Sequence, residues 1–173
     1  MKTDRSTLTI RDARPGVLDE VALLLKDAYQ QYAPLIPADA WQSYLTDIMD
    51  VKSRLEDSAL IVAELEGRLA GAVTLYLDGS RLEVWPEGWA GIRLLAVHPK
   101  YRGRHIGHAL MEECIRRCRE KAIKAIGLHT TEAMDVARRM YERMGFIRMP
   151  ELDFHPSPEA VVMAYKLELQ SDR

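Results

Sequence analysis

The chain has 173 residues, of which 47% are hydrophobic and 29% are charged, and its formal net charge is -2 at pH 7. This composition excludes a disordered chain, and the small net charge excludes bulk electrostatic attraction to nucleic acid or membrane. The length favours one domain, and a polar first stretch with no later run of about 18 apolar residues predicts a cytoplasmic protein.

The first half of the chain contains both helical and strand patterns. Apolar residues recur every third or fourth position after Pro15, whereas two short apolar runs turn at Glu66 and Gly67. The elements predicted here, in chain order, are a strand over 7–11, a helix over 15–32 that Pro34 and Pro37 end, a second helix over 37–50 and a hairpin over 58–77.

The second half begins with a polar loop and continues with alternating strands and helices. Gly145 follows the last helix, as a glycine C-cap does, and Cys114 and Cys118 lie on the apolar side of a helix, as core residues do. The predicted elements are a loop over 78–89, a strand over 90–99, a helix from Ile106 to about Lys121, a strand over 123–130, a helix over 132–144, and strands over 146–150 and 161–169. This order predicts an α/β (α+β) fold with a mixed sheet and helices on its faces.

The turn between the strand over 90–99 and the following helix has the chemistry of an anion site. Residues 102–108 read RGRHIGH, with two glycines that let a ligand approach the backbone and four basic side chains around it. The first turn of a helix has unpartnered N-H groups and a partial positive charge of about half an elementary charge. The pattern predicts a phosphate cradle, with a plain connection as the alternative; it matches neither a Walker loop nor a dinucleotide fingerprint.

Two segments resemble motifs of a known family. LLAVHPKYRGRHIGHALM, residues 94–111, resembles the R/Q-x-x-G-x-G/A motif of the GNAT-type N-acetyltransferase superfamily, and ARRMYERMGF, residues 137–146, resembles its A-x-x-L-Y-x-x-x-G-F motif. The resemblance implies one N-acetyltransferase domain over 1–173 with a GNAT-like three-layer fold, in which a mixed, mostly antiparallel sheet of about six to seven strands is flanked by about four helices.

The same resemblance implies an activity and a cofactor site. The protein would transfer an acetyl or other acyl group from coenzyme A to a primary amine of a small molecule or peptide by direct attack, with acetyl-CoA as co-substrate and no metal. Strand backbone would hold the pantetheine arm and the thioester carbonyl, and backbone amides of the turn would hold the pyrophosphate. The implied cofactor-binding residues are Leu95, Ala96, Val97, Arg102, Gly103, Arg104, His105, Ile106, Gly107 and His108.

Three residues depart from the family pattern. His105 stands where the family usually has a glycine, so either the backbone stays helical there or coenzyme A binding is compromised. Met134 stands where an asparagine often contacts the cofactor. Gly91 replaces an acidic residue that many similar sequences carry, which leaves the general base unassigned by the motif.

Acyl transfer to an amine needs a free amine lone pair, stabilisation of an oxyanion and a proton for the thiolate. Tyr141 is the predicted proton donor, because a tyrosine with a pKa of about 10 is protonated at neutral pH; a core aromatic is the alternative. Glu83 and Glu87, in the loop before the strand over 90–99, could each act as the base directly or through water or be ordinary solvated carboxylates, and Glu83 is the one predicted; His98 and His129 lie at strand ends and are further candidates. His129 is more readily explained as a structural or edge residue.

Other features leave alternatives open. The long loop and the second helix carry aromatic residues that either line an acceptor pocket or pack in the core: Trp41, Tyr44, Trp85 and Trp89. A non-catalytic acyl-CoA sensor with the same fold is the rival function, and nucleic-acid binding through the basic residues after Cys114 is disfavoured by interspersed glutamates. The motifs do not identify the acceptor amine, and a homodimer is left open.

Overall fold

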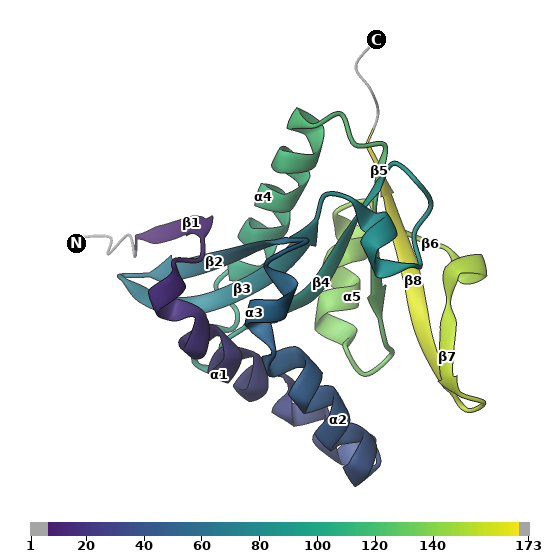
Figure 1. Cartoon of the computed structure of the whole chain (residues 1–173), viewed down its shortest axis with the longest axis horizontal. Helices are drawn as coiled ribbons and strands as arrows, with labels where there is room; N and C mark the ends of the chain where they lie inside the picture. Colours follow the sequence, from purple (N-terminus) through teal and green to yellow (C-terminus); the bar gives the residue numbers. More distant parts are fainter. Residues whose placement is uncertain (1–6, 170–173) are drawn as a thin grey trace. The chain divides into compact units, whose positions relative to one another are not determined.

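The computed structural model describes residues 7–169. Figure 1 shows the course of the chain. The α-helices are α1 (Leu18–Tyr29), α2 (Ala38–Met49), α3 (Val51–Arg54), α4 (Ile106–Glu120) and α5 (Asp135–Arg143). The strands are β1 (Leu8–Asp12), β2 (Ala59–Leu65), β3 (Arg68–Tyr76), β4 (Trp89–Val97), β5 (Ala125–Thr130), β6 (Ile147–Arg148), β7 (Phe154–Ser157) and β8 (Ala160–Glu168).

Strand pairing confirms the predicted mixed, mostly antiparallel sheet. The hydrogen-bonded order is β1-β2-β3-β4-β5-β8-β6, and β7 pairs with β8. β4 and β5 are parallel, whereas β1–β2, β5–β8, β6–β8 and β7–β8 are antiparallel. The described residues form eight strands. The strand that the sequence pattern did not predict is β7, whose four residues include a proline and are all exposed.

The chain divides into two compact units, each described here by itself. The first comprises residues 7–74 and 94–113, and the second comprises residues 75–93 and 114–169. β3, β4 and α4 each run from one unit into the other. The predicted single domain over 1–173 stays a prediction.

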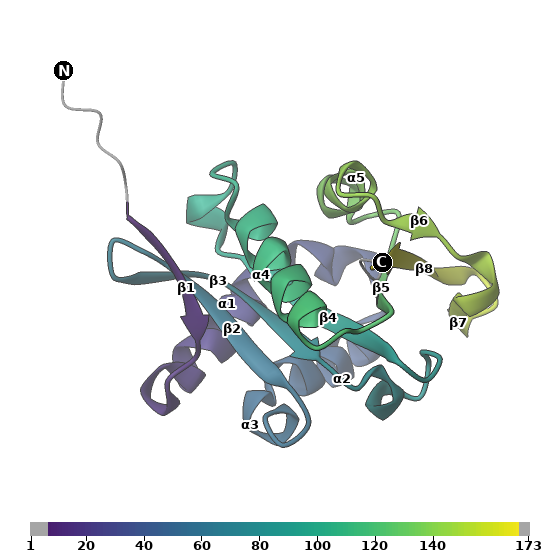
Figure 2. The same ribbon diagram turned by 90° about the horizontal axis from the view of Figure 1, so that it is seen from above.

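In the first unit, helices lie on both sides of the strands. α1 lies on one face of β2 and β3, and the first turns of α4 lie on the other (Figure 2). Gly71 of β3 permits this packing, because a Cβ there would lie 3.0 Å from both the Ala96 carbonyl oxygen and Cγ2 of Ile106. The start of α4 is thereby held against the strand that precedes it.

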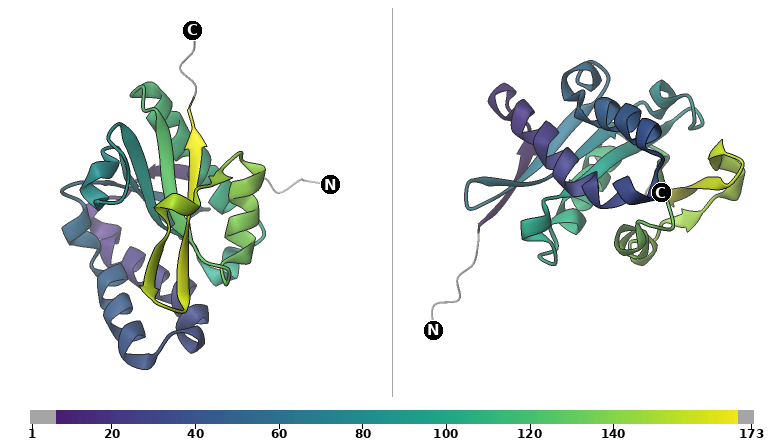
Figure 3. Two further views of the ribbon diagram at one scale, coloured as in Figure 1. Left: turned by 90° about the vertical axis from the view of Figure 1, so that its right-hand side faces the viewer. Right: turned by 90° about the horizontal axis from the view of Figure 1, so that it is seen from below.

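In the second unit, a tryptophan packs directly on the parallel strands. Gly91 of β4 is paired with Gly127 of β5, and a Cβ on either glycine would come within 2.5 to 3.1 Å of the Trp85 indole. Figure 3 shows β5 and β8 side by side, with α5 next to them and the β7–β8 hairpin at one end. Cys114 and Cys118 are fully buried, which confirms their predicted core position, and burial raises the pKa of Cys118 to about 12.

Candidate functional site

Near its end, β4 contains a residue with an unusual backbone conformation. Leu94 has φ +55°, a conformation that is uncommon for a bulky residue within a strand. The side chains of Leu94 and Ala96 are buried, while Leu95 and Val97 are partly exposed. The Tyr29 hydroxyl donates a hydrogen bond of 3.0 Å to the Leu95 carbonyl, which uses one acceptor site of that oxygen.

His98 connects β4 to the turn and is held by a hydrogen bond to one ring nitrogen. Its Nδ1 accepts a hydrogen bond of 3.1 Å from the backbone N-H of Lys100, and its Nε2 lies 3.8 Å from a carboxylate oxygen of Asp27. Its backbone N-H also donates to the Ala70 carbonyl at 2.8 Å. These contacts give His98 a structural role, because the lone pair of Nδ1 accepts from Lys100 and the neutral ring then has its proton on Nε2.

The predicted cradle is an exposed turn followed directly by a helix. Gly103 has φ +79°, which favours glycine, and a Cβ there would meet no atom within 4 Å. The Ala109 N-H donates to the His105 carbonyl at 3.1 Å, as the first turn of α4 begins. The N-H groups of residues 106–108 therefore come before the first bond of the helical ladder, which is where a helix can bind an anion.

His105 has a different backbone from the expected helical one. Its φ is +59°, in the left-handed region, and its side chain is exposed. His105 thus adopts the conformation that a glycine adopts without strain. For an L residue such as histidine, this conformation costs about 1 kcal/mol. Of the two alternatives for this position, the structure therefore does not have the first, a right-handed helical backbone, and whether His105 weakens coenzyme A binding stays untested.

The two arginines of the turn have different environments. Nη2 of Arg102 donates to the Ala28 carbonyl at 3.3 Å, in the last turn of α1, where a cation is favoured. The Arg104 guanidinium carbon lies 5.9 Å from the centre of the Tyr101 ring. Burial raises the pKa of Tyr32, and the nearby Arg102 charge partly opposes that rise. Arg102 therefore ties the turn to α1, and Arg104 is the arginine of the turn whose charge is available to a ligand.

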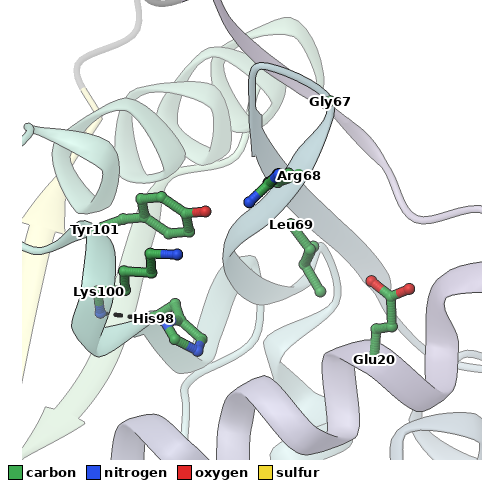
Figure 4. Close-up of a pocket in the computed structure, with 7 residues that line it drawn as sticks. All are labelled: Glu20, Gly67, Arg68, Leu69, His98, Lys100 and Tyr101. Atoms are coloured by element: carbon green, nitrogen blue, oxygen red, sulfur yellow. Dashed lines mark hydrogen bonds between the residues drawn. The ribbon is translucent and has the colours of Figure 1, made fainter.

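Beside this turn lies a cavity of about 440 Å³. Figure 4 shows the side chains of Arg68, Lys100 and Tyr101 turned toward one another, with Glu20 farther away beyond Leu69. Arg68 comes from the start of β3, so its place next to the turn is a non-local feature that sequence spacing does not reveal. Arg68 and Lys100 thus place positive charge next to the turn.

Tyr141 lies in the second unit, on α5. Its side chain is 6% exposed, and its ring centre lies 5.7 Å from that of Phe146. Gly145 has φ +99°, and the Phe146 N-H donates to the Tyr141 carbonyl at 3.0 Å, which confirms the predicted glycine C-cap. The burial agrees with the core alternative for Tyr141 and leaves its predicted role as proton donor a prediction.

In the loop over 78–89, the structure exposes Glu83 and buries Trp85. Glu83 ends the 3-10 turn Gly79–Leu82, is exposed and has φ +57°. Trp85 is only 6% exposed and stacks on Trp89 at 6.0 Å, so its ring covers the sheet and does not line an open pocket. The Leu82 side chain and the Trp85 indole occupy the space that a side chain at Gly91 would need, which explains the glycine there.

His129 is more constrained than the sequence indicated. Its ring centre lies 4.5 Å from that of Trp85 and 5.0 Å from that of Phe154, and its Nε2 lies 2.9 Å from the Leu152 carbonyl oxygen. Burial lowers the pKa of His129 below its usual value. No sequence pattern links His129 to Leu152, because they are 23 residues apart.

Metal sites and membrane spans are absent from the part of the chain that the structure describes. Residues 7–169 contain no group of three or more His, Cys, Asp or Glu arranged to hold a metal ion. None of the helices within this range is long and apolar enough to cross a membrane.

Comparison with known proteins shows which family the sequence matches and which solved structures have a similar fold. The model of the acetyltransferase (GNAT) family matches residues 19–146. Among solved structures, the chain is similar to the PaiA N-acetyltransferase of Thermoplasma acidophilum in complex with coenzyme A, with 16% identity and a TM-score of 0.76 over 94% of this chain and 99% of that one. It is also similar to a GNAT family acetyltransferase of Brucella melitensis in complex with acetyl-CoA, with 20% identity and a TM-score of 0.62 over 98% and 92% of the two chains.

A third similar structure has a protein acceptor in its name. The ribosomal-protein-S18-alanine N-acetyltransferase of Escherichia coli matches with 14% identity and a TM-score of 0.66 over 96% of this chain and 97% of that one. At these identities the structural likeness shows the shared fold, while the match of the family model over 19–146 concerns the sequence itself.

Proposed function

Because the chain belongs to the acetyltransferase (GNAT) family, we propose that it transfers an acetyl group from acetyl-CoA to a primary amine of a small molecule or peptide. The observation that carries the proposal is the exposed turn over 102–105, which leads directly into the first N-H groups of α4, before its helical ladder begins. The bound coenzyme A and acetyl-CoA of two similar structures support the choice of donor.

The chain's own groups would divide the binding of acetyl-CoA between strand and turn. The backbone of Leu95, Ala96 and Val97 would pair with the pantetheine arm, and the N-H groups of the turn would bind the pyrophosphate. Arg104 is exposed and would add charge. Acetyl-CoA supplies an activated acyl group as a thioester, and the residues present fit its polyanionic nucleotide end because four basic residues lie within 102–108.

For the chemistry, Tyr141 is the proposed donor of a proton to the departing thiolate, on the strength of the ARRMYERMGF motif. Glu83 is the base proposed from sequence, and its exposure favours action through water over direct contact. The proposal includes a cytoplasmic location and leaves a homodimer open.

The experiment that tests the function combines binding with turnover. Calorimetric titration with acetyl-CoA should show a single binding event, and a thiol-release assay against a panel of primary amines should show turnover with at least one of them. Binding without thiol release from any amine would favour the rival acyl-CoA sensor. No binding at millimolar acetyl-CoA would refute both.

A further inference from the structure

The inference concerns the cavity of about 440 Å³ beside the turn, whose lining residues all lie in the first unit. Figure 4 shows the side chains of Arg68, Lys100 and Tyr101 turned toward one another. A guanidinium, an ammonium and a phenol hydroxyl are all hydrogen-bond donors. Within residues 7–169, none of these three polar groups has a hydrogen bond or an ion pair. Donors that face one space without an acceptor are the chemistry of an anion site.

The charge around these donors is mostly positive. The Lys100 ammonium nitrogen and the Arg104 guanidinium carbon each lie 5.9 Å from the centre of the Tyr101 ring, and Arg68 adds a third cation. Glu20 is the acidic residue of the lining, and its carboxylate lies apart from the three donors (Figure 4). Like charges that gather at one place repel each other, and a bound anion offsets that repulsion.

Arg68 is brought to the cavity by the turn between β2 and β3. The two residues of this turn, Glu66 and Gly67, have φ +53° and +79°, as the central residues of a tight hairpin turn do. Arg68 follows directly as the first residue of β3. Its backbone position is therefore set by the hairpin, and its exposed side chain extends from there.

Lys100 and Tyr101 are held in place by His98. The Tyr101 N-H donates to the His98 carbonyl at 2.8 Å, and the Lys100 N-H donates to Nδ1 of His98 at 3.1 Å. The His98 N-H donates in turn to the carbonyl of Ala70 in β3 at 2.8 Å. The residues that supply the donors are thus joined through β3, and a site whose backbone is fixed before binding costs less to order.

The donor set fits a phosphate monoester better than a carboxylate. A phosphate monoester is close to dianionic at neutral pH, which matches the two cations Arg68 and Lys100. Its three terminal oxygens can accept from several directions, and an arginine can bind two of them at once. The cavity has room for the phosphate and for part of the molecule that carries it.

We infer that this cavity is a phosphate-binding site, with Arg68, Lys100 and Tyr101 as the donors, and that it is separate from the N-H groups of residues 106–108. The phosphate has two possible sources. One is the phosphate monoester on the ribose of acetyl-CoA, and this source rests on the proposed function. The other is a second phosphorylated small molecule, which does not depend on that function.

The first test is an NMR titration of the full chain with inorganic phosphate, against sodium chloride at equal ionic strength. Phosphate should shift the amide signals of residues 67–69 and 100–101. Its affinity should fall about tenfold in Arg68→Gln and in Lys100→Gln, because each variant loses a charge-assisted hydrogen bond. Lys52→Gln removes an exposed cation of α3 outside the lining, and this matched control should bind phosphate like the parent.

Calorimetric titration with acetyl-CoA and with acetyl-dephospho-CoA, which lacks only the ribose phosphate, separates the two sources. If the ribose phosphate occupies the cavity, the parent should bind acetyl-CoA about tenfold more tightly than the dephospho form, and Lys100→Gln should remove most of that difference. Equal affinities for the two forms, with phosphate still shifting the amides of 67–69 and 100–101 in the presence of acetyl-CoA, would assign the cavity to a second molecule.

The outcomes keep this inference apart from the proposed function. If phosphate shifts only the amides of 105–108, or if Arg68→Gln and Lys100→Gln both bind it like the parent, the inference is overturned whatever the result with acetyl-CoA. If phosphate binds at the cavity but the parent neither binds acetyl-CoA nor releases thiol, the proposed function fails and the phosphate site stands. Arg68 and Lys100 are exposed, so the melting temperatures of both variants should stay close to that of the parent.

Discussion

His105 is the residue at which the cradle is under strain. An L residue at φ +59° costs about 1 kcal/mol, part of which is offset because glycine increases the entropy of the unfolded chain. His105→Gly should therefore leave the free energy of unfolding unchanged or raise it by about 0.5 kcal/mol. His108→Gly, inside the first turn of α4, should lower it by about 1 kcal/mol. Urea denaturation of both variants checks the difference, and equal losses would show that residue 105 carries no backbone strain.

Tyr141 is the residue at which the core and catalytic explanations give different results. Tyr141→Phe keeps the buried ring against Phe146 and removes the hydroxyl. If Tyr141 is the proton donor, the loss of its hydroxyl should lower turnover about 10²-fold and leave the affinity for acetyl-CoA unchanged. Tyr165→Phe is the control, because the Tyr165 hydroxyl donates to Glu142 at 3.0 Å in a structural bond. A steady-state assay in which both variants match the parent would remove Tyr141 from the mechanism.

At the scale of elements, Arg102 links the turn to the end of α1. Arg102→Ala removes its hydrogen bond to the Ala28 carbonyl and a cation near a helix C-terminus, so we expect a loss of about 1 kcal/mol in the free energy of unfolding. Arg104→Ala should leave stability nearly unchanged and weaken acetyl-CoA binding more than Arg102→Ala does. Thermal unfolding and calorimetric titration of the two variants provide the measurements. A stronger binding defect in Arg102→Ala would contradict the division of roles.

The pairing of β4 with β5 depends on two glycines beneath Trp85. A Cβ at Gly127 would lie 2.5 Å from the indole, so Gly127→Ala should lower the free energy of unfolding by about 1 to 3 kcal/mol, as overpacking does. Gly16→Ala is the control, because a Cβ there meets nothing within 4 Å and no positive φ is involved. If chemical denaturation finds both variants equally stable, the indole does not lie on the strands as described.

The same elements show how far sequence reasoning reaches. Periodicity and turn residues predicted α1, α2, α4 and α5 and most strands, since these patterns are local. β7 was missed because a proline lies within its four residues and proline is depleted in strands. The cradle segment follows from local chemistry, but the contacts of Trp85 with Gly127 and of His129 with Leu152 join residues 42 and 23 positions apart. Spacing along the chain does not encode such pairs.

For the whole molecule, acetyl-CoA binding should act first on one unit. All the implied cofactor-binding residues lie within 94–113, in the first unit, whereas Tyr141 and His129 lie in the second. Ligand at 100 times its Kd should add about 2.7 kcal/mol to the free energy of unfolding. Hydrogen exchange should show the largest new protection at the amides of 106–108, because these groups precede the first bond of the helical ladder and a bound pyrophosphate would accept from them. Protection confined to the second unit would place the cofactor elsewhere, since the cradle would then have bound nothing.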